Sequence, residues 1–452
     1  MTTTSMSGSH EPASQPAATA GRTPTAPREM RKIAGASAIG TGIELYDFLI
    51  FGLAAGLVFP KLFFPESDPL VGSLLSFMTF GAGFLSRPLG GIVFGHFGDR
   101  FSRKTMLVIS LVATGACTVA MGLLPTYATV GVLAPILLVA LRVLQGFFMG
   151  GEQSGAFLMV TEHAPTGRKS FYGAFVTAGS PIGSILGIGV FNIVAVATGP
   201  AFGEWGWRIP FLASAVLIAV GIYVRLGIAE SPVFRTMAAD KTVTKLPLAS
   251  VLATALPLLL GGVLVNLGFN LFIFIVNSFS MSYGTEHLGM DRNVILMSGM
   301  AGSVGMLISV FVAGWLADRV GLIKVMLAGA LFQVIWAFPY FMLFDSRSAG
   351  LIYVAVIVAY VGLSFVFGPM AAYYVSLFKP EHRYSGVALS YNLGAVLGGG
   401  LSPSIATWLM GTFEGSSTAI SAYIAIGGVL SAIGLLITAP QVRRASTATL
   451  GD

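Results

Sequence analysis

Long apolar runs separated by short polar stretches make up most of the chain. A helix needs about 20 mainly apolar residues to cross the ~30 Å hydrocarbon core of a bilayer. Residues 216–228, for example, do not alternate between apolar and polar positions as the strands of a membrane barrel would. The pattern therefore predicts twelve spanning helices, near residues 33–59, 71–94, 105–124, 131–156, 171–197, 208–228, 250–283, 294–317, 325–344, 349–376, 385–411 and 418–438.

The composition agrees with a membrane protein. Charged residues make up 10% of the chain, against roughly 25% in soluble globular domains, which is too few to solvate a surface of this size. Glycine occurs 57 times among 452 residues, and small residues allow the close helix packing of membrane bundles. We therefore expect an all-α, multi-pass membrane protein.

The sequence offers no sign of an enzyme. Cys117 is the single cysteine, which excludes an intramolecular disulfide and a cysteine-based metal site. No Ser-His-Asp arrangement or phosphate-cradling loop stands on a soluble segment. The interpretation is a protein without catalytic residues, metal or cofactor.

The basic residues indicate how the chain is oriented. The net charge is +6, but the basic side chains fall in short loops and not on one face. In the predicted topology, nineteen of the 25 Lys and Arg residues lie on the side that holds both termini and four on the other, with Arg87 and Arg142 inside spans. Because basic loops stay in the cytoplasm, we expect both termini there, a lipid bilayer around the chain and no nucleic-acid partner.

Two motifs repeat at nearly the same offset, close to half the chain length. Gly95-His-Phe-Gly-Asp99-Arg100 returns as Gly314-Trp-Leu-Ala-Asp318-Arg319 after 219 residues, and Pro165-Thr-Gly-Arg168 returns as Pro380-Glu-His-Arg383 after 215 residues. An internal repeat of this size indicates a duplicated unit of six helices. Two repeated bundles that move about a central site are typical of secondary transporters.

The repeat divides the chain into parts. The first residues are rich in Ser, Thr, Ala and Pro and lack apolar periodicity, which predicts disorder. We expect a disordered cytoplasmic tail at 1–30, an N-terminal six-helix bundle at 31–228, a cytoplasmic linker at 229–249, a C-terminal six-helix bundle at 250–438 and a cytoplasmic tail at 439–452.

Several segments resemble the motifs of a known family. GHFGDRFSRK at 95–104 resembles the loop 2–3 motif of the major facilitator superfamily, and LRVLQGF at 141–147 resembles its helix 4 motif. ELYDF, FLSRPLGGIVFGHFGD, QGFFMGGE, WGWRIPF and ESPVF together resemble the metabolite:proton symporter family, most of all its shikimate-type carriers. Ser102 and Gln153 depart from that pattern, in which a Gly and an aromatic residue are usual.

The resemblance implies the major facilitator fold in a bacterial cytoplasmic membrane, and a monomer that carries a small metabolite together with protons. It also implies a gate formed by the repeated loop motifs, with Asp99 holding the inward side shut through charge pairs and a helix N-terminus, where an anion is favoured. The alternative for these loops is a topology signal made of positive charge alone. The predicted gating residues are Gly95, Asp99, Arg100, Arg103, Lys104, Gly314, Asp318 and Arg319.

Five charged side chains lie well inside the predicted spans, all in the N-terminal half: Glu44, Asp47, Arg87, Arg142 and Glu152. A charge at the bilayer centre costs at least ~2.5–3.5 kcal/mol on insertion scales, so each one asks for an explanation. We predict that Asp47 is the main proton-coupling residue, assisted by Glu44, with Arg142 as a switchable ion partner and Glu152 as a further candidate. Static ion pairs between helices are the alternative.

The predicted substrate contacts come from both halves. The asparagines at 266, 270 and 277 form a narrow polar stripe if the seventh span is a regular α-helix. Such residues either line a cavity or hydrogen-bond helices together. The predicted set is Arg87, Arg142, Gln145, Gln153, Asn266, Asn270, Asn277, Tyr373, Tyr374, Tyr391 and Asn392.

These features predict a proton-coupled symporter that imports a small organic acid by alternating access. The five intramembrane charges sum to −1, so an anionic substrate meets repulsion until one carboxylate takes up a proton. The arginines fit a carboxylate-bearing substrate, whereas the acids leave an amino acid or betaine open. The closest alternative is a proton-coupled antiporter that exports small molecules, because Gly179-Ser-Pro-Ile-Gly183 weakly resembles the Gly-Pro element of drug exporters.

Overall fold

The computed structural model describes residues 27–227, 230–231, 234, 236 and 247–448. Residues 1–26 of the predicted tail, residues 237–246 of the predicted linker and residues 449–452 lie outside that part. Within the described part, every regular element is a helix.

Twelve helical stretches of the described chain are long and apolar enough to cross a bilayer, which confirms the predicted number of spans. The first six spans are built from α1 (Pro27–Leu57), α3 (Pro69–Arg100), α4 (Arg103–Gly122), α6 (Leu133–Met149) with α7 (Glu152–His163), α8 (Lys169–Thr198) with η1 (Gly199–Phe202), and α9 (Arg208–Leu226). Two short helices join these spans, α2 (Phe59–Phe63) and α5 (Tyr127–Val130).

The second half begins with the short helix α11 (Pro247–Thr254) and contains the other six spans. They are built from α12 (Leu256–Phe274) with η2 (Ile275–Phe279), α13 (Ser280–Ser282) and η3 (Tyr283–His287); α14 (Arg292–Val320); α15 (Leu322–Asp345); α16 (Ala349–Phe367) with α17 (Met370–Leu377); η4 (Pro380–His382) with α18 (Arg383–Ala395), η5 (Val396–Gly400) and α19 (Ser402–Thr412); and α20 (Ser417–Ala448).

The first and last helices extend further than hydropathy predicts. The first, α1, begins at Pro27, inside the predicted tail, and α20 continues to Ala448, inside the other predicted tail. Hydropathy registers only the part of a helix that can lie in lipid, whereas backbone hydrogen bonding continues past the hydrocarbon core.

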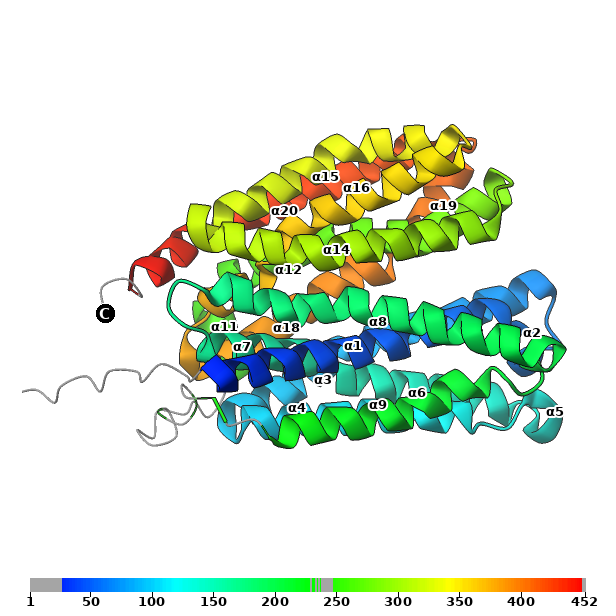
Figure 1. Cartoon of the computed structure of the whole chain (residues 1–452), viewed down its shortest axis with the longest axis horizontal. Coiled ribbons are helices and arrows are strands. Elements are labelled where there is room, and N and C mark those ends of the chain that lie inside the picture. The colour runs from blue at the N-terminus through cyan, green and yellow to red at the C-terminus, as the bar shows by residue number, and fades with distance from the viewer. Residues whose placement is uncertain (1–26, 228–229, 232–233, 235, 237–246, 449–452) are drawn as a thin grey trace, which may run out of the picture.

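Each half of the chain packs into its own bundle. In the first bundle α1 packs on α8, α3 on α6 and α4 on α9, and in the second α12 and α15 pack on α20 while α14 and α15 pack on α16. Figure 1 shows the two bundles as separate layers whose helices run roughly along the long axis. Two six-helix bundles are the fold class predicted from the internal repeat.

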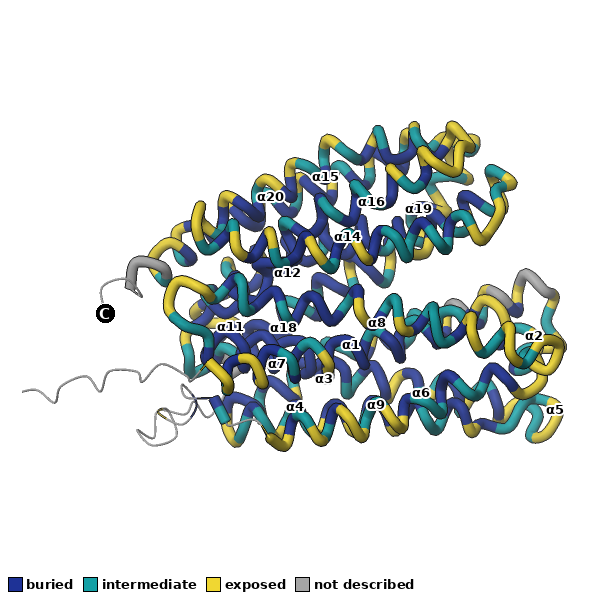
Figure 2. Tube along the Cα trace, viewed as in Figure 1, coloured by how far each residue is buried: buried dark blue, intermediate teal, exposed yellow. Residues whose placement is uncertain are grey.

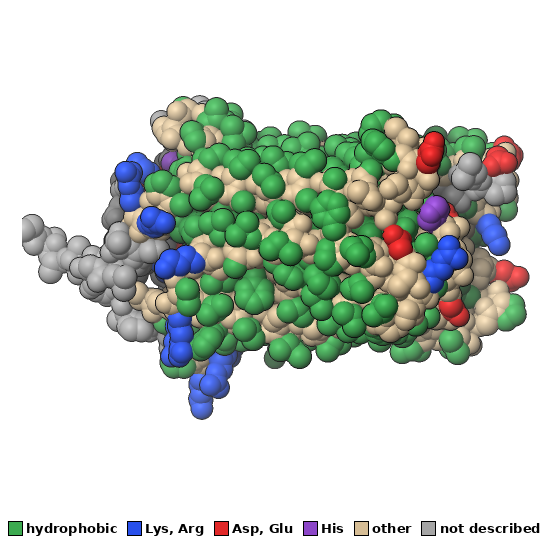
Figure 3. Space-filling model, turned by 90° about the horizontal axis from the view of Figure 1, so that it is seen from above, with side chains coloured by type: hydrophobic (Ala, Val, Ile, Leu, Met, Phe, Trp, Pro, Cys, Tyr) green, Lys and Arg blue, Asp and Glu red, His purple; other side chains and the backbone are tan. Residues whose placement is uncertain are grey.

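The long sides of the molecule are apolar. Figure 3 shows hydrophobic side chains over the middle of one face, most of the basic side chains at one end, and the acidic ones with a few basic ones at the other. Buried positions line the inside of each bundle, and exposed positions lie on the outer turns (Figure 2). Val196 and Met342, for example, are 85% and 71% exposed. An apolar surface this extensive faces lipid and not water.

The two bundles meet at one end of the molecule. The start of α1 and the last turns of α20 lie at the same end (Figure 1), which we call the termini end. The main inter-bundle contacts are made by α8 with α14 and α17, by α3 with α18, and by α7 with α17 and α18. Toward the opposite end the ribbons of the two bundles diverge (Figure 1).

Candidate functional site

Asp47 of α1 lies at the centre of a hydrogen-bond network inside the first bundle. Its side chain is fully buried. One carboxylate oxygen accepts from the hydroxyl of Ser214 on α9 at 2.6 Å, and the other accepts from Thr118 on α4 at 2.8 Å. None of the ion pairs in the described part of the chain includes Asp47. It is therefore a membrane-embedded carboxylate whose partners are neutral.

The same network continues to Arg142 of α6. Gln145 Nε2 donates to Thr118 Oγ1 at 2.7 Å, and Arg142 Nη1 donates to Gln145 Oε1 at 2.5 Å. The buried guanidinium of Arg142 lies over the ring of Phe51, 4.2 Å from its centroid, in a cation–π contact. In this conformation Arg142 reaches Asp47 through two neutral side chains and does not form an ion pair with it.

Glu44, one turn before Asp47 on α1, has a different partner. Its Oε1 lies 3.5 Å from Arg87 Nη2 on α3. Its Oε2 is buried and has no hydrogen-bond partner among the described residues. The Arg87 side chain keeps 12% of its surface exposed and lies over the ring of Phe84, 5.0 Å from its centroid. The two acids that the sequence places on one side of α1 therefore separate into two sites.

Glu152, at the start of α7, is paired with a cation. Arg225, near the end of α9, donates from Nη2 to Glu152 Oε1 at 2.6 Å and from Nη1 to the carbonyl oxygen of Leu107. Both side chains are buried. The neighbouring Gln153 is buried too, and its Nε2 has no hydrogen-bond partner within the described chain.

Phenylalanine rings connect the two arginines to the second bundle. Phe48 of α1 and Phe84 of α3 pack against Phe274 of α12, with ring centroids 6.0 and 5.4 Å apart. The guanidinium groups of Arg87 and Arg142 both lie over Phe48, 5.5 and 5.2 Å from its centroid. The charged groups of the first bundle are thus placed directly behind its contact with α12.

The asparagines of the seventh span lie in two different surroundings. Asn266 and Asn270 are buried, and their side-chain amides donate to the carbonyl oxygens of Tyr391 at 2.6 Å and of Asn266 at 2.8 Å. Asn277 is exposed and accepts from the hydroxyl of Tyr360. It lies in η2, a π-helical segment with wider turns than an α-helix. The predicted regular stripe therefore ends at Asn270.

Two of the predicted tyrosines form hydrogen bonds within their own bundle. The hydroxyls of Tyr373 and Thr438 lie 2.9 Å apart, and the hydroxyl of Tyr374 donates to the carbonyl oxygen of Gly262 at 2.7 Å. Both tyrosine side chains are fully buried. In this conformation they hold α17 against α20 and α12.

Tyr391 and Asn392 of α18 connect the bundles. The ring of Tyr391 packs on Phe157 of α7, with centroids 5.7 Å apart. The side-chain amide of Asn392 donates to the carbonyl oxygen of Gly150 at 2.7 Å. These residues lie at the surface between the bundles, where a transported molecule passes in an alternating-access carrier.

The repeated loop motifs join the bundles in two equivalent places at the termini end. Asp99, at the end of α3, accepts from the backbone N–H groups of residues 384–385 in the first turn of α18, both at 2.9 Å. Asp318, at the end of α14, accepts from those of residues 170–171 in the first turn of α8, also at 2.9 Å. Because a helix N-terminus favours an anion, each carboxylate caps a helix of the other bundle.

The motif glycines allow this close approach. A Cβ atom at Gly95 would lie 2.8 Å from Ser385 Cα, and one at Gly314 would lie 2.7 Å from the carbonyl oxygen of Ser170. Both obstacles are backbone atoms that cannot turn aside. Only glycine fits at these two contacts without separating the helices.

The first basic motif belongs to a buried charge cluster. Arg103 pairs with Glu162 of α7, whose other carboxylate oxygen lies 3.1 Å from Arg383 of α18. Lys104 Nζ donates to the carbonyl oxygen of Leu226 at 2.9 Å. Arg103 and Lys104 thus tie α4 to α7 and α9, and Glu162 extends the cluster to the second bundle.

The other two basic motif residues do not cross between the bundles. Arg100 lies over the ring of Phe101 and Arg319 over that of Trp315, 5.6 and 4.2 Å from the centroids. Both contacts are local, within one turn of the chain. In this conformation Asp99 and Asp318 make the paired motif contacts between the bundles, and Arg103 adds a hydrogen bond from Nη2 to the carbonyl oxygen of Pro380 at 3.4 Å.

Ser102, which departs from the family pattern, begins α4. Its hydroxyl oxygen accepts from the backbone N–H of Thr105 at 3.0 Å, and the hydroxyl donates to Glu230 at 2.5 Å. A serine in this place is a favourable N-cap. The substitution is accommodated by local helix capping.

Close packing accounts for the Gly-Pro element of α8. A Cβ atom at Gly179 would lie 2.9 Å from the backbone nitrogen of Gly42, and one at Gly183 would lie 3.0 Å from that of Tyr46. These glycines allow α8 to pack on α1. They need no role in drug export.

Sequence reasoning missed Thr118, Ser214, Arg225 and Glu162. Hydroxyl residues are common in membrane helices and often bond their own backbone, so no sequence pattern marks Thr118 or Ser214 as partners of Asp47. Arg225 gives a signal, because it lies inside the predicted span 208–228, where as a helix-end residue it is one of the nineteen basic residues on the side of the termini. Glu162 lies beyond the predicted fourth span, and the longer helix α7 buries it.

Comparisons with known proteins agree with this architecture. The family model of the Major Facilitator Superfamily matches residues 38–403. The inner membrane metabolite transport protein YhjE of Escherichia coli K12 is 40% identical over 413 residues, which cover 90% of this chain and 93% of the relative. The shikimate transporter of the same organism is 36% identical over 411 residues, covering 90% and 94%.

More distant matches have the same fold. The proline/betaine transporter of Escherichia coli K12 is 32% identical over 444 residues, covering 94% of this chain and 87% of the relative. The solved structure of the proton:xylose symporter XylE bound to 6-bromo-6-deoxy-D-glucose is similar with a TM-score of 0.72 at 16% identity, over 90% of this chain and 95% of that one. The chain is therefore a membrane transporter of the Major Facilitator Superfamily and belongs, as its similarity to the YhjE protein and the shikimate transporter shows, to the metabolite:proton symporter family.

Proposed function

We propose that this transporter is a proton-coupled symporter that imports a small organic acid, with Asp47 as its main proton-coupling residue. The observation that carries the proposal is a fully buried carboxylate whose two partners are the neutral hydroxyls of Ser214 and Thr118. A buried carboxylate without a cation is costly when ionised. Binding a proton removes that cost, so the site suits reversible proton uptake.

Thr118 can transmit a change in the protonation of Asp47 to the rest of the hydrogen-bond network. Its hydroxyl lies 2.8 Å from Asp47 and 3.2 Å from the carbonyl oxygen of Thr114, and it can donate to one of them at a time. When Asp47 takes a proton, it becomes a donor and Thr118 can turn its own proton toward Thr114. Gln145 and then Arg142 sense this rearrangement, because both belong to the same network. Protonation at Asp47 thereby alters how firmly Arg142 is held.

Arg87 and Arg142 are the proposed anchors for the substrate carboxylate. A guanidinium presents a fork of N–H donors that matches a carboxylate. Arg87 is partly exposed and reaches Glu44 only at 3.5 Å, so it retains donors for a ligand. The proposed neighbouring contacts are Gln145, Gln153, Asn266, Asn270, Asn277, Tyr373, Tyr374, Tyr391 and Asn392. A relative named as a shikimate transporter supports an organic acid, and one named as a proline/betaine transporter keeps a zwitterion as the alternative.

The buried charges support one proton per anionic substrate. The five charges considered from the sequence sum to −1, but Arg225 is buried with them and brings the total to zero. A bound monoanion then adds one negative charge to a region of low dielectric. One proton, taken by Asp47 with the help of Glu44, cancels it.

Alternating access is proposed to proceed through the termini end, which we assign to the cytoplasm of a bacterial cell because the basic loops gather there. Asp99 and Asp318 would hold this side closed, with Gly95 and Gly314 allowing the contact and the basic residues of both motifs supporting it. Capping bonds can break and re-form in each cycle. The protein is proposed to work as a monomer, with both termini in the cytoplasm.

Transport by the reconstituted protein tests the proposal. Liposomes are loaded with a pH-sensitive dye and given radiolabelled shikimate, other organic acids, sugars or betaine outside. We expect a carboxylate-bearing compound to accumulate when the outside is acidic, with protons entering alongside it. Protons that leave as the solute enters would support the antiporter instead, and accumulation indifferent to pH and voltage would contradict proton coupling.

A further inference from the structure

Three buried oxygen atoms on α1 and α7 lie toward the termini end from Asp47 and have no hydrogen-bond partner in the described chain. They are Thr41 Oγ1, Glu44 Oε2 and Glu152 Oε2. Leaving such a group unsatisfied destabilises the fold, so natural proteins rarely retain several together without a function. Thr41 and Glu44 are three residues apart on α1 and therefore lie on one face of that helix. They form a polar path beside Glu152.

Arg225 lies across this path. Its guanidinium is fixed by Glu152 at 2.6 Å and by the carbonyl oxygen of Leu107, and it packs against Gly40 of α1, one turn before Glu44. The side chain is 5% exposed, so its charge is enclosed by the bundle. An enclosed cation is an electrostatic barrier to protons.

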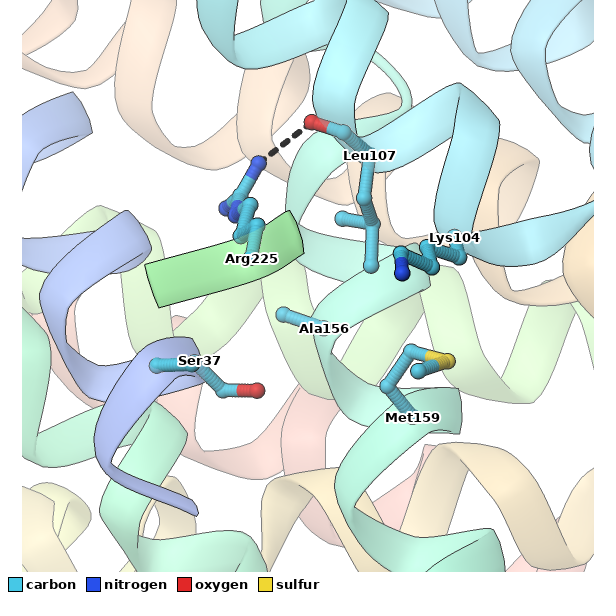
Figure 4. A pocket seen from close by; sticks show the side chains of 7 residues that line it. Ser37, Lys104, Leu107, Ala156, Met159 and Arg225 are labelled. Atoms are coloured by element: carbon cyan, nitrogen blue, oxygen red, sulfur yellow. Dashed lines mark hydrogen bonds between the residues drawn. The ribbon is translucent and has the colours of Figure 1, made fainter. Parts of the chain in front are cut away.

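Arg225 lines a pocket together with Ser37 of α1 (Figure 4). Because Ser37 precedes Gly40 and Glu44 on that helix, the pocket lies toward the termini end from them. It is formed by α1, α4, α7 and α9, and its lining includes Ser37, Lys104, Ala156 and Arg225. The cavity has a volume of about 10 Å³, which is roughly what one water molecule needs. Ser37 is four residues before Thr41 on α1, so the pocket continues the same polar face.

We propose that protons released from the coupling site leave through the interior of the N-terminal bundle, from Glu44 to Glu152 and out through this pocket, with Arg225 as the gate of the route. The inference rests on the proposed proton coupling and adds its exit path. It assigns Glu152 as a proton carrier and Arg225 as a positioning residue that acts through Glu152. The surface between the two bundles is then left to the substrate.

The transfer is balanced at each stage. Asp47 gives its proton to Glu44, Glu44 then loses a proton from its carboxyl group while Glu152 Oε2 gains one, and no electrons move. The neutral Glu152 no longer attracts Arg225, so the guanidinium is free to move from Gly40. When Glu152 gives its proton to water in the pocket, the ion pair re-forms and closes the route.

The charges around Glu152 come from several elements. Arg225 on α9, Arg87 on α3, and Glu44 and Asp47 on α1 all interact electrostatically with it, and the hydroxyl of Tyr384 on α18 is a further titratable neighbour. On the α4 side Lys104 lines the pocket. Arg225 is the member of this group that both contacts Glu152 and lines the pocket, which makes it the point at which to test the gate.

A proton-leak assay tests the gate without any knowledge of the substrate. The full-length protein is sealed in liposomes that contain the pH dye pyranine, the voltage is clamped with potassium and valinomycin, and a pH gradient is imposed. Wild type should be as tight as liposomes without protein. Arg225→Gln should collapse the gradient at least about tenfold faster, because the barrier cation is gone. The double variant Arg225→Gln with Glu152→Gln should be tight again, because the carrier is missing.

A second variant keeps all charges. Gly40→Ala places a methyl group where the guanidinium of Arg225 lies, so it should displace that group and cause a leak of the same kind. Gly35→Ala on the same helix meets no atom within 4 Å and is the matched control. If gel filtration shows that Arg225→Gln does not fold, the proton leak of Gly40→Ala tests the gating role of Arg225 instead.

Tight liposomes with every properly folded gate variant, or a leak that persists in the double variant, would overturn the exit route. The proposed symport is judged separately by solute-driven proton uptake of the wild type. Such uptake together with tight gate variants overturns the route alone, whereas a wild type without it overturns the proposed function itself.

Discussion

Asp47 and Arg142 are buried in the same bundle with opposite charges, yet they are joined only through the neutral side chains of Thr118 and Gln145. A direct ion pair would hold the carboxylate ionised and the guanidinium in place. The indirect connection leaves Asp47 able to exchange a proton, while any change in its hydrogen bonds reaches Arg142. This relationship distinguishes the site from a static structural pair.

Thr118→Val tests the connection itself. The substitution keeps the shape of the side chain but leaves Asp47 Oδ2 and Gln145 Nε2 without their shared partner. A buried polar group that loses its partner costs about 1–3 kcal/mol, so we expect a lower Tm and slower accumulation of substrate. Thr118→Ser should retain both properties. Thr407→Val, whose exposed hydroxyl bonds its own helix, is the control, and equal behaviour of the two valine variants would refute the role of Thr118.

Asp318→Asn tests the gate at the termini end. The variant loses the charge in two capping bonds, and hydrogen bonds to charged groups contribute about 1.5–3 kcal/mol. We therefore expect the equilibrium between the closed and open states of the termini end to shift at least about tenfold toward the open state, since 1.4 kcal/mol corresponds to a factor of ten. Distances between spin labels on α8 and α14 measure the populations. Lys324→Gln at the same end should change nothing, and an unchanged distance distribution in Asp318→Asn would rule out its gating role.

Asp99→Asn should have the same effect at the second contact, measured between α3 and α18. The two aspartates occupy equivalent positions in the repeat and make equivalent bonds. If the gate depends on both, the double variant should open further than either single variant. A double variant no more open than Asp318→Asn would show that one contact suffices.

Gly314→Ala tests the close approach without changing charge. Its new Cβ atom would lie 2.7 Å from the carbonyl oxygen of Ser170, so the termini end cannot close as tightly. We expect cysteines introduced at that end to react with a water-soluble thiol reagent in a larger fraction of the molecules, and we expect transport to be slower. Gly299→Ala on the same helix has no atom within 4 Å and should behave as wild type. Identical labelling of the two variants would mean that the contact does not limit closure.

Arg87→Gln tests the proposed anchor of the substrate. Losing charge-assisted bonds of about 1.5–3 kcal/mol should raise the KM of a carboxylate substrate by at least about tenfold. Arg87→Lys should have an intermediate effect, because lysine keeps the charge and loses the fork. Arg292→Gln, an exposed arginine at the start of α14, is the control. A KM equal to that of wild type would show that Arg87 does not bind the substrate carboxylate.

The sequence predicts the fold well because lipid imposes a simple length and polarity requirement on every span. Residue 225 shows where that reasoning stops. Position in the chain places Arg225 at a helix end among the cations of the termini side, whereas packing turns it inward to Glu152. Which way a helix end faces depends on its neighbours, and hydropathy does not contain that information.

The site was predicted only in outline for the same reason. Charges inside spans are rare, so Asp47 and Arg142 stand out in the sequence. Gln145, the partner of Arg142, belongs to the predicted set, whereas Thr118 and Ser214, the partners of Asp47, are ordinary residue types that acquire a role only through three-dimensional contact. For Asn277 the predicted position on the helix surface is wrong, because the π-helical segment around it breaks the regular α-helical spacing from which that position follows.

Accumulation by Asp47→Asn tests the central claim most directly. The variant is reconstituted beside wild type and Glu204→Gln, which removes an exposed carboxylate from a loop. Each is assayed for solute exchange without a gradient and for uphill uptake driven by an inward proton gradient. The account predicts that Asp47→Asn still exchanges solute but no longer concentrates it, whereas the other two do both. Uphill, pH-driven uptake by Asp47→Asn at the wild-type level would contradict it.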